Sequence, residues 1–155
     1  MPIERQQLNS DLIRSVELLA EVFDNMSIRY ALIGGLATML RGRPGFTQDV
    51  HFLLDVPQLV FPGLLEKLAD RGFSIDRATM IREYVHEQMT TCRYGVARID
   101  MLKPVLPLYA RTISNASRLD WTEGVSLPVA KAEGLILTKM VSFRSQDKAR
   151  NRCRM

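Results

Sequence analysis

The sequence of 155 residues has only two cysteines, few aromatic residues and no long apolar segment. Cys92 and Cys153 lie far apart and lack the CxxC spacing of a zinc site, which argues against a fold stapled by a metal or by disulfides. No apolar run approaches the roughly 20 residues that a membrane-spanning helix needs. The N-terminal segment MPIERQQLNSDLIRS is charged from its start and has no apolar signal core. We therefore expect a cytoplasmic protein with no membrane-bound part.

An excess of positive charge is found only at the C-terminal end. The net charge is +4, and residues 144–155 carry five basic side chains against one acid, so this segment accounts for the whole excess. A basic tail can contact phosphates without sequence specificity, and a solvated chain end explains the same pattern. Nucleic-acid binding by the tail therefore stays open as one interpretation.

Composition and periodicity predict one α/β or α+β domain over residues 1–155. With 46% hydrophobic residues, a chain of this length can bury about 70% of its surface without staples. Apolar residues at steps of three and four predict a helix over about 4–26, followed by a core over about 28–143 and a basic tail over 144–155. Since strand and helix patterns are mixed rather than strictly alternating, we expect a mixed, partly antiparallel sheet flanked by helices.

Within the core, turn residues and period-two patterns separate short strands from helices. The predicted strands are 30–33, 47–55, 73–75, 89–94, 96–102 and 125–130. The predicted helices are 36–40, 57–71, 78–86, 106–116 and 132–143. In the second strand, Val50, Phe52 and Leu54 face one way, whereas Asp49 and His51 face the other. One face of this strand therefore packs in the core and the other presents polar groups.

Two glycines and two acids form a pattern suited to phosphoryl transfer. Gly34 and Gly35 follow a strand and precede a short helix, where backbone N–H groups can approach a phosphate. Asp49 and Asp100 project outward from two other strands and could hold Mg²⁺ against that phosphate. Residue 51 lies on the same face as Asp49, about 6.6–6.8 Å along the strand. Geometry therefore makes His51 a third candidate metal ligand.

The pair GG at 34–35, a spacer of 13 residues, DVH at 49–51 and the later Asp100 form one pattern. It resembles the nucleotidyltransferase superfamily, which shares the palm fold of DNA polymerase β. The segments YALIGGLATMLRGRPGFTQDVHFLLDV, RIDMLKP and LPVAKAEGLILTKMVSFRSQD are most similar to small bacterial nucleotidyltransferase-like proteins found beside toxin–antitoxin and abortive-infection systems. The similarity extends over about residues 30–147.

The resemblance implies a palm fold and the metal-dependent transfer of a nucleoside monophosphate from an NTP to a protein, RNA or small-molecule hydroxyl. Gly34 and Gly35 would contact the triphosphate, and Asp49 would be the first metal-binding acid. Asp100 would be the third acid, which helps to activate the acceptor hydroxyl. The cofactor would be Mg²⁺ or Mn²⁺.

The second acid of the family pattern falls on His51, which departs from that pattern. Mg²⁺ prefers oxygen ligands, whereas Mn²⁺, Zn²⁺ and Ni²⁺ accept an imidazole. Three interpretations are open: His51 ligates a softer metal in an active enzyme, it marks a degenerate site, or it is an altered residue in an otherwise acidic motif. The alternative to an enzyme is a non-catalytic member of the same fold that acts as a binding or antitoxin-like partner.

Other polar residues could also contact the nucleotide. Arg41, Arg43 and Thr47 precede or begin the second strand and could bind the triphosphate. The resemblance places Lys139 on the nucleotide-facing side of a late apolar helix, although a lysine that only extends into solvent fits equally well. Asp147 matches a later acid of the same proteins. We expect the apolar surface of the late helix to need cover from a second copy of the chain or from a partner protein.

Overall fold

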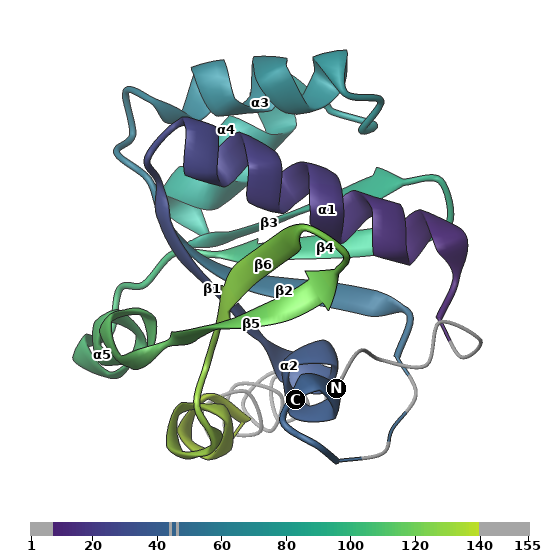
Figure 1. The fold of residues 1–155 in the computed structure, drawn as a ribbon. Coiled ribbons are helices and arrows are strands. Elements are labelled where there is room, and N and C mark those ends of the chain that lie inside the picture. The colour runs from purple at the N-terminus through teal and green to yellow at the C-terminus, as the bar shows by residue number, and fades with distance from the viewer. Residues whose placement is uncertain (1–7, 44, 46, 140–155) are drawn as a thin grey trace, which may run out of the picture.

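The computed structural model describes residues 8–43, 45 and 47–139 (Figure 1). Asp147, Cys153 and the basic tail at 144–155 lie outside these ranges. The described chain forms a six-stranded sheet with helices on both faces, which confirms the predicted α/β class with a mixed sheet. Within the same ranges, no helix is both long enough and apolar enough to cross a membrane.

The order of the elements follows the predicted mixture of strands and helices. They are α1 (Ser10–Asn25), β1 (Arg29–Ile33), α2 (Gly34–Leu40), β2 (Asp49–Asp55), α3 (Phe61–Asp70), α4 (Arg77–His86), β3 (Met89–Tyr94), β4 (Ala97–Leu102), α5 (Pro107–Asn115), β5 (Ser117–Thr122) and β6 (Val125–Val129). A further helix spans residues 132–139.

The sheet contains both parallel and antiparallel pairs, in the strand order β3-β4-β2-β1-β6-β5. β1 pairs antiparallel with β2, as do the strands of the hairpins β3–β4 and β5–β6. β2 pairs parallel with β4, and β1 pairs parallel with β6. In the register of β2 with β4, Asp49 lies opposite Arg98 and His51 lies opposite Asp100. Two strands that are far apart in the sequence therefore bring their polar ends side by side.

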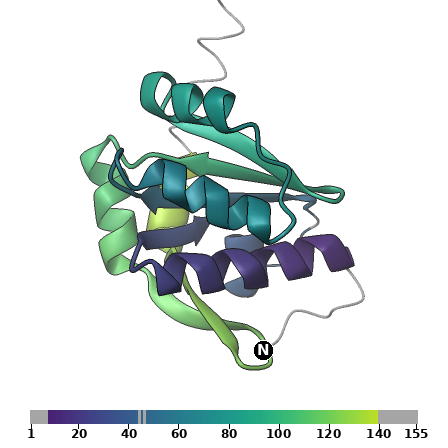
Figure 2. The same cartoon turned by 90° about the horizontal axis from the view of Figure 1, so that it is seen from above.

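The helices form a layer on each face of the sheet (Figures 1 and 2). α1, α3 and α4 cover one face, over a core that includes Val50, Phe52 and Leu54 of β2. α5 and the helix at 132–139 lie on the other face, over a smaller core that includes Leu53. β2 is thus buried on both faces at Phe52, Leu53 and Leu54, whereas the end that holds Asp49 and His51 is partly open to solvent and Asp55 at the other end is exposed.

Three helices begin at residues that differ from the predicted ones. α1 begins at Ser10 rather than near residue 4, because Asn9 stays extended and its Oδ1 accepts a hydrogen bond of 2.7 Å from the N–H of Asp11. α2 begins at Gly34 rather than at residue 36, so the two glycines form its first turn. α3 begins at Phe61, and the residues from 57 to 60 form a turn instead of helix.

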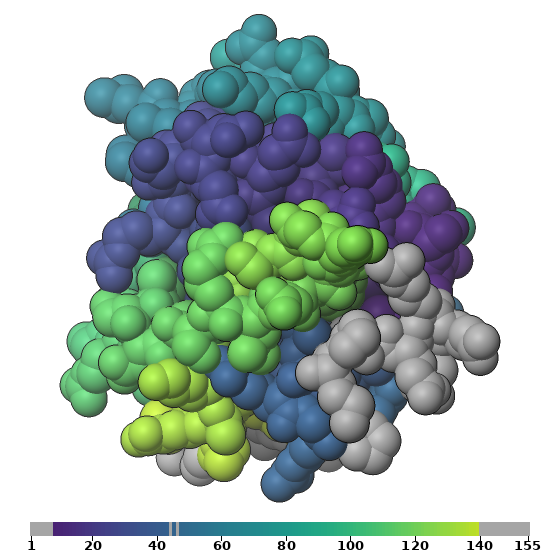
Figure 3. Space-filling view, in the orientation of Figure 1, coloured from purple at the N-terminus to yellow at the C-terminus, as the bar shows by residue number. Residues whose placement is uncertain are grey.

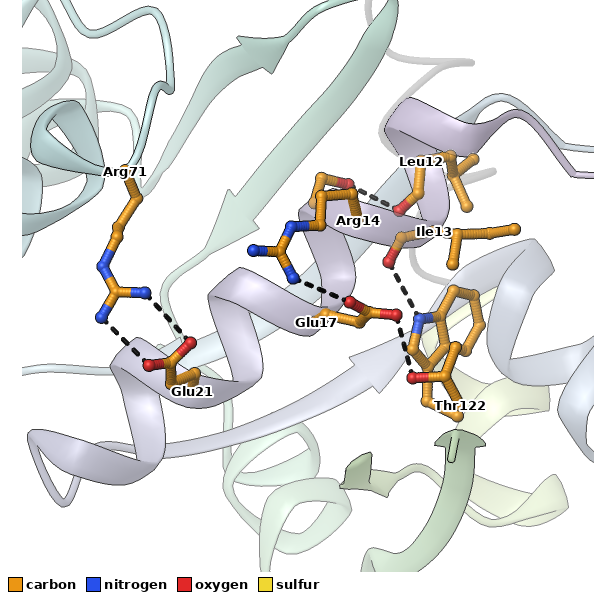
Figure 4. A network of polar contacts seen from close by, with 9 residues as sticks. Leu12, Ile13, Arg14, Glu17, Glu21, Arg71 and Thr122 are labelled. Atoms are coloured by element: carbon orange, nitrogen blue, oxygen red, sulfur yellow. Dashed lines mark hydrogen bonds and ion pairs between the residues drawn. The ribbon is translucent and has the colours of Figure 1, made fainter. Parts of the chain in front are cut away.

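β5 was not predicted, although Leu119 and Trp121 alternate with polar residues in its short sequence SRLDWT. Tertiary contacts hold it in place: the indole N–H of Trp121 donates to the carbonyl of Ile13 at 3.1 Å, and the hydroxyl of Thr122 donates to Glu17 at 2.9 Å (Figure 4). Through these contacts α1, β5 and β6 form one continuous face of the molecule (Figure 3). The edge strand is therefore held by α1 and by its pairing with β6.

Candidate functional site

The chain turns sharply where β1 ends and α2 begins. Gly34 has φ of +77°, a left-handed conformation that disfavours any residue with a side chain. A Cβ atom built on Gly34 would lie 3.2 Å from Cδ2 of His51, and one on Gly35 would lie 3.2 Å from Cβ of Thr47. The tertiary structure thus places Gly34 against His51 and Gly35 against Thr47, all four of them predicted site residues. The absence of a side chain at each glycine leaves room for its neighbour.

A cavity of about 310 Å³ opens beside this turn and is here named the glycine-turn cavity. Its volume lies at the lower end of the ~300–1,000 Å³ range of small-molecule sites. The lining residues are Ile33, Gly34, Gly35, Thr38, Met39, Gly45, His51, Leu102, Leu135, Thr138 and Lys139. The walls therefore combine apolar side chains with bare backbone, hydroxyls, one imidazole and the cation of Lys139, which comes from a distant part of the sequence.

The sequence predicts that Asp100 projects outward, but the residue is buried, with an exposed fraction of 4%. Its Oδ1 accepts hydrogen bonds from the hydroxyl of Thr91 at 2.7 Å and from Nε of Arg98 at 3.2 Å. Its Oδ2 lies 3.3 Å from Nδ1 of His51, an ion pair whenever the imidazole is protonated. Three neighbours thus satisfy this carboxylate, which explains how a charged group is tolerated there.

Four side chains, two acidic and two basic in alternation, share one face of β2 and β4, and they are here named the charge quartet: Asp49, His51, Arg98 and Asp100. The parallel register sets Asp49 opposite Arg98 and His51 opposite Asp100. Residues two apart on one strand also point to the same face. Each acid therefore has a basic residue as its neighbour both along its strand and across to the next one.

The charge quartet does not fit the two divalent ions expected from the sequence resemblance. Among the described residues, no group of three or more His, Cys, Asp or Glu side chains is arranged to hold a metal ion. The carboxylate of Asp100 is already bonded to Thr91 and Arg98. A guanidinium keeps its charge at all ordinary pH values, so Arg98 opposes a dication at this position.

The two arginines of the loop after α2 behave differently from each other. Arg41 does not face the glycine-turn cavity: its guanidinium donates to the carbonyls of Val129 and Ala130 at 2.8 and 3.1 Å and to the hydroxyl of Ser117 at 2.7 Å. It therefore ties α2 to β6 and β5 and is not available to a triphosphate. Arg43 is exposed and is not among the residues that line the cavity.

Two residues of the site, Thr91 and Arg98, were not predicted from the sequence. The alternation of β4 puts Arg98 on the same face as Asp100, which is a signal that could have identified it. The two-residue turn at Gly95 and Val96 sets the register of the β3–β4 hairpin, in which Thr91 lies opposite Asp100. Both contacts were thus encoded locally.

Comparisons with known proteins give matches in structure but not in sequence. No protein-family model matches the chain, and no curated protein sequence matches it. The Thermotoga maritima protein TM1012, which has been assigned as a nucleotidyltransferase, superposes with a TM-score of 0.60 at 13% identity, over 94% of this chain and 92% of that one. The lincosamide antibiotic adenylyltransferase LnuA, solved with lincomycin bound, superposes with a TM-score of 0.56 at 14% identity, over 84% of this chain and 85% of that one.

Both neighbours match over most of their own length, so the likeness is one of complete folds and not of a shared fragment. At these identities the likeness concerns the fold alone. The likeness confirms the fold that was expected from the resemblance of the glycine pair and the two acids. The chain has the fold of the nucleotidyltransferase superfamily.

Proposed function

We propose that this chain binds a nucleotide in the glycine-turn cavity and that it is a non-catalytic member of the nucleotidyltransferase fold. The observation that carries the proposal is the state of Asp100, which is buried and bonded to Arg98 and Thr91 instead of being open to a metal ion. The cavity argues for binding, and the charge quartet argues against catalysis.

The composition of the cavity wall suits the two halves of a nucleotide. Apolar side chains such as Leu102 and Leu135 offer a surface for a base. The bare backbone at Gly34 and Gly35 lets a phosphate approach closely, and the ammonium group of Lys139 can neutralise its charge. A nucleotide is therefore the ligand class that we expect.

The proposal is tested by calorimetric titration of the chain with ATP, GTP, CTP and UTP. We expect saturable binding of at least one of them, weakened about tenfold by Lys139→Met, which is the usual loss for one charge-assisted contact. The matched control is Lys67→Met on α3, an exposed lysine on the opposite face of the sheet, which should leave the affinity unchanged. Lack of binding by all four nucleotides would contradict the proposal.

A second candidate function is nucleotidyl transfer to a protein, RNA or small-molecule hydroxyl. It is favoured by one observation, namely that Asp49, His51 and Asp100 share one face of the sheet. Mg²⁺ or Mn²⁺ would remain the expected cofactor, and Mn²⁺ accepts an imidazole more readily. LnuA is an adenylyltransferase, and for the present chain the same kind of transfer is a proposal.

The two functions are separated by incubating the chain with labelled NTPs and either metal. Label on the chain, on RNA or on a co-purified protein, lost in Asp49→Asn and retained in Asp55→Asn, would establish transfer and overturn the non-catalytic proposal. Asp55 is a suitable control because it is exposed at the other end of β2. Silence with both metals, together with nucleotide binding, would support the non-catalytic proposal.

The toxin–antitoxin setting, the cytoplasmic location and the need for a second copy or a partner protein stay predictions. The helix at 132–139 exposes Ile136 and Leu137, with exposed fractions of 63% and 36%. Light scattering coupled to size-exclusion chromatography measures whether the chain is a monomer in solution. A partner protein would be sought by pull-down with the complete chain.

A further inference from the structure

We infer that His51 and Arg98 act as fixed basic groups in the place of divalent metal ions, so that the acids Asp49 and Asp100 bind no free Mg²⁺ or Mn²⁺. A second consequence is that the ligand of the glycine-turn cavity binds without a metal. That consequence rests on the proposed nucleotide binding, whereas the exclusion of metal does not.

The first step of the argument is the register of β2 and β4. Neighbouring strands lie about 4.8 Å apart, and residues two apart on one strand are separated by about 6.6–6.8 Å. The pairs Asp49–Arg98 and His51–Asp100 are therefore the short sides of a rectangle, and the two acids occupy opposite corners. The acids do not adjoin each other, and each has a basic residue as its nearest neighbour on this face.

The second step is the bonding of Asp100. A metal ion at this carboxylate would have to displace Nε of Arg98 at 3.2 Å or approach Nδ1 of His51 at 3.3 Å. Burial of the carboxylate, with a side-chain exposed fraction of 6%, removes the water that would otherwise complete the coordination of Mg²⁺. The acid is thus satisfied from within the chain.

The third step concerns which residues an incoming ligand can meet. The side chains of His51 and Arg98 are 35% and 44% exposed, whereas Asp100 lies beneath them. His51 also lines the glycine-turn cavity. A ligand in the cavity therefore meets the imidazole of His51 before it meets the buried acid, whereas Arg98 on the neighbouring strand is not among the residues that line the cavity. An N–H donor of this kind binds phosphate oxygens directly.

The exclusion of metal is tested with Mn²⁺ alone, titrated into the complete chain and followed by electron paramagnetic resonance. We expect no saturable binding by the natural chain in the millimolar range. His51→Asp and Arg98→Met should each improve the affinity for Mn²⁺ by at least about tenfold, the size of change typical for residues around a metal site. Adding Asp49→Asn to His51→Asp should remove the gain.

Matched controls are His86→Asp and Arg82→Met, since both residues are exposed on α4 and away from the charge quartet. They should leave Mn²⁺ binding unchanged, and circular dichroism should show that all variants are folded. Saturable Mn²⁺ binding by the natural chain that is lost in Asp49→Asn would overturn the inference. Folded His51→Asp and Arg98→Met variants whose affinity for Mn²⁺ equals that of the natural chain would also overturn it.

The metal independence of the ligand is tested separately by titrating ATP, GTP, CTP and UTP in EDTA and in Mg²⁺. Equal affinity within about twofold supports the inference, and binding that requires Mg²⁺ overturns it. Because the Mn²⁺ measurement contains no nucleotide, its failure leaves nucleotide binding intact. Lack of nucleotide binding in both conditions would instead contradict the proposed function alone.

Discussion

His51 lies directly against Gly34, where β2 passes the start of α2, so that a Cβ atom on Gly34 would come within 3.2 Å of Cδ2 of the imidazole. The same imidazole approaches Asp100 through Nδ1. The side chain at position 51 is therefore held by the glycine turn on one side and by the neighbouring strand on the other. A substitution at Gly34, His51 or Asp100 should therefore shift the side chains of the other two positions or their contacts.

Replacement of Gly34 by alanine should destabilise the chain by more than the same change at Gly124. Both glycines have nearly the same φ, +77° and +79°, which costs an alanine about 1–2 kcal/mol. At Gly124 nothing lies within 4 Å of the added Cβ, whereas at Gly34 the imidazole of His51 must move. Urea unfolding measures both losses, and equal losses would contradict the close contact.

Replacement of Arg41 by alanine should lower the free energy of unfolding by about 1–3 kcal/mol, because the carbonyls of Val129 and Ala130 lose their donor. The matched change Arg43→Ala, two residues later on an exposed side chain, should stay within about 0.5 kcal/mol. Chemical denaturation compares the two variants. If Arg43→Ala were the more destabilising change, the assignment of Arg41 as the structural residue would be wrong.

Replacement of Asp100 by asparagine should destabilise the chain by about 1–3 kcal/mol in the absence of any metal. The reason is that Nε of Arg98 would lose its charged acceptor at 3.2 Å and would face a neutral amide instead. Asp55→Asn, at the exposed end of β2, is the control and should have little effect. Equal stability of the two variants would show that the contacts of Asp100 contribute nothing to folding.

Alkaline pH should destabilise the fold through Cys92 and Tyr84. Burial, and then the charge of Asp100, raise the pKa of the Cys92 thiol to about 12, and burial raises the pKa of Tyr84 to about 12. The folded chain therefore holds these protons more tightly than the unfolded chain, and their stabilisation is complete below about pH 9. It is lost as pH rises toward 12, by at most ~1.4 kcal/mol per pH unit for each group.

This pH dependence is measured by urea unfolding at several pH values between about 8 and 11, a range that brackets the ordinary thiol and phenol pKa values. Cys92→Ala should remove the part of the decline that begins near pH 9. Tyr84→Phe should remove a part that begins near pH 10, and it should also lower stability at neutral pH because the phenol donates to the carbonyl of Leu54 at 2.6 Å. Unchanged slopes in both variants would contradict the assignment.

Most strands could be predicted because their signal is local. The alternation in β2 and the turn at Gly95 predicted β2, β3 and β4 to within two residues, since side chains two apart must share a face. β5 was missed although Leu119 and Trp121 alternate with polar residues, because this signal is short and the strand is held by contacts of Trp121 and Thr122 with the distant residues Ile13 and Glu17. The start of α1 was placed too early, because the cap formed by Asn9 outweighs the apolar period.

In the candidate site, too, some features could be predicted from local sequence patterns and others could not. The spacing of the glycine pair, Asp49, His51 and Asp100 predicted the residues of the candidate site, which stay a prediction, and structural similarity confirmed the fold that the resemblance implied. The presence of Lys139 in the wall of the glycine-turn cavity depends on how the helix at 132–139 packs beneath the sheet. That packing is a contact between distant segments, which no local pattern encodes.

The sequence by itself determined the glycine turn, the polar faces of β2 and β4 and the departure at His51, because each depends on residue type and on the short-range geometry of a strand or turn. Only the tertiary structure decided which residues face the acids across the β2–β4 pair. The parallel register of β2 with β4 sets each acid beside a base, and burial of Asp100 strengthens its contacts with His51 and Arg98. Charge pairing across strands depends on register, and register is settled by the packing of the whole sheet.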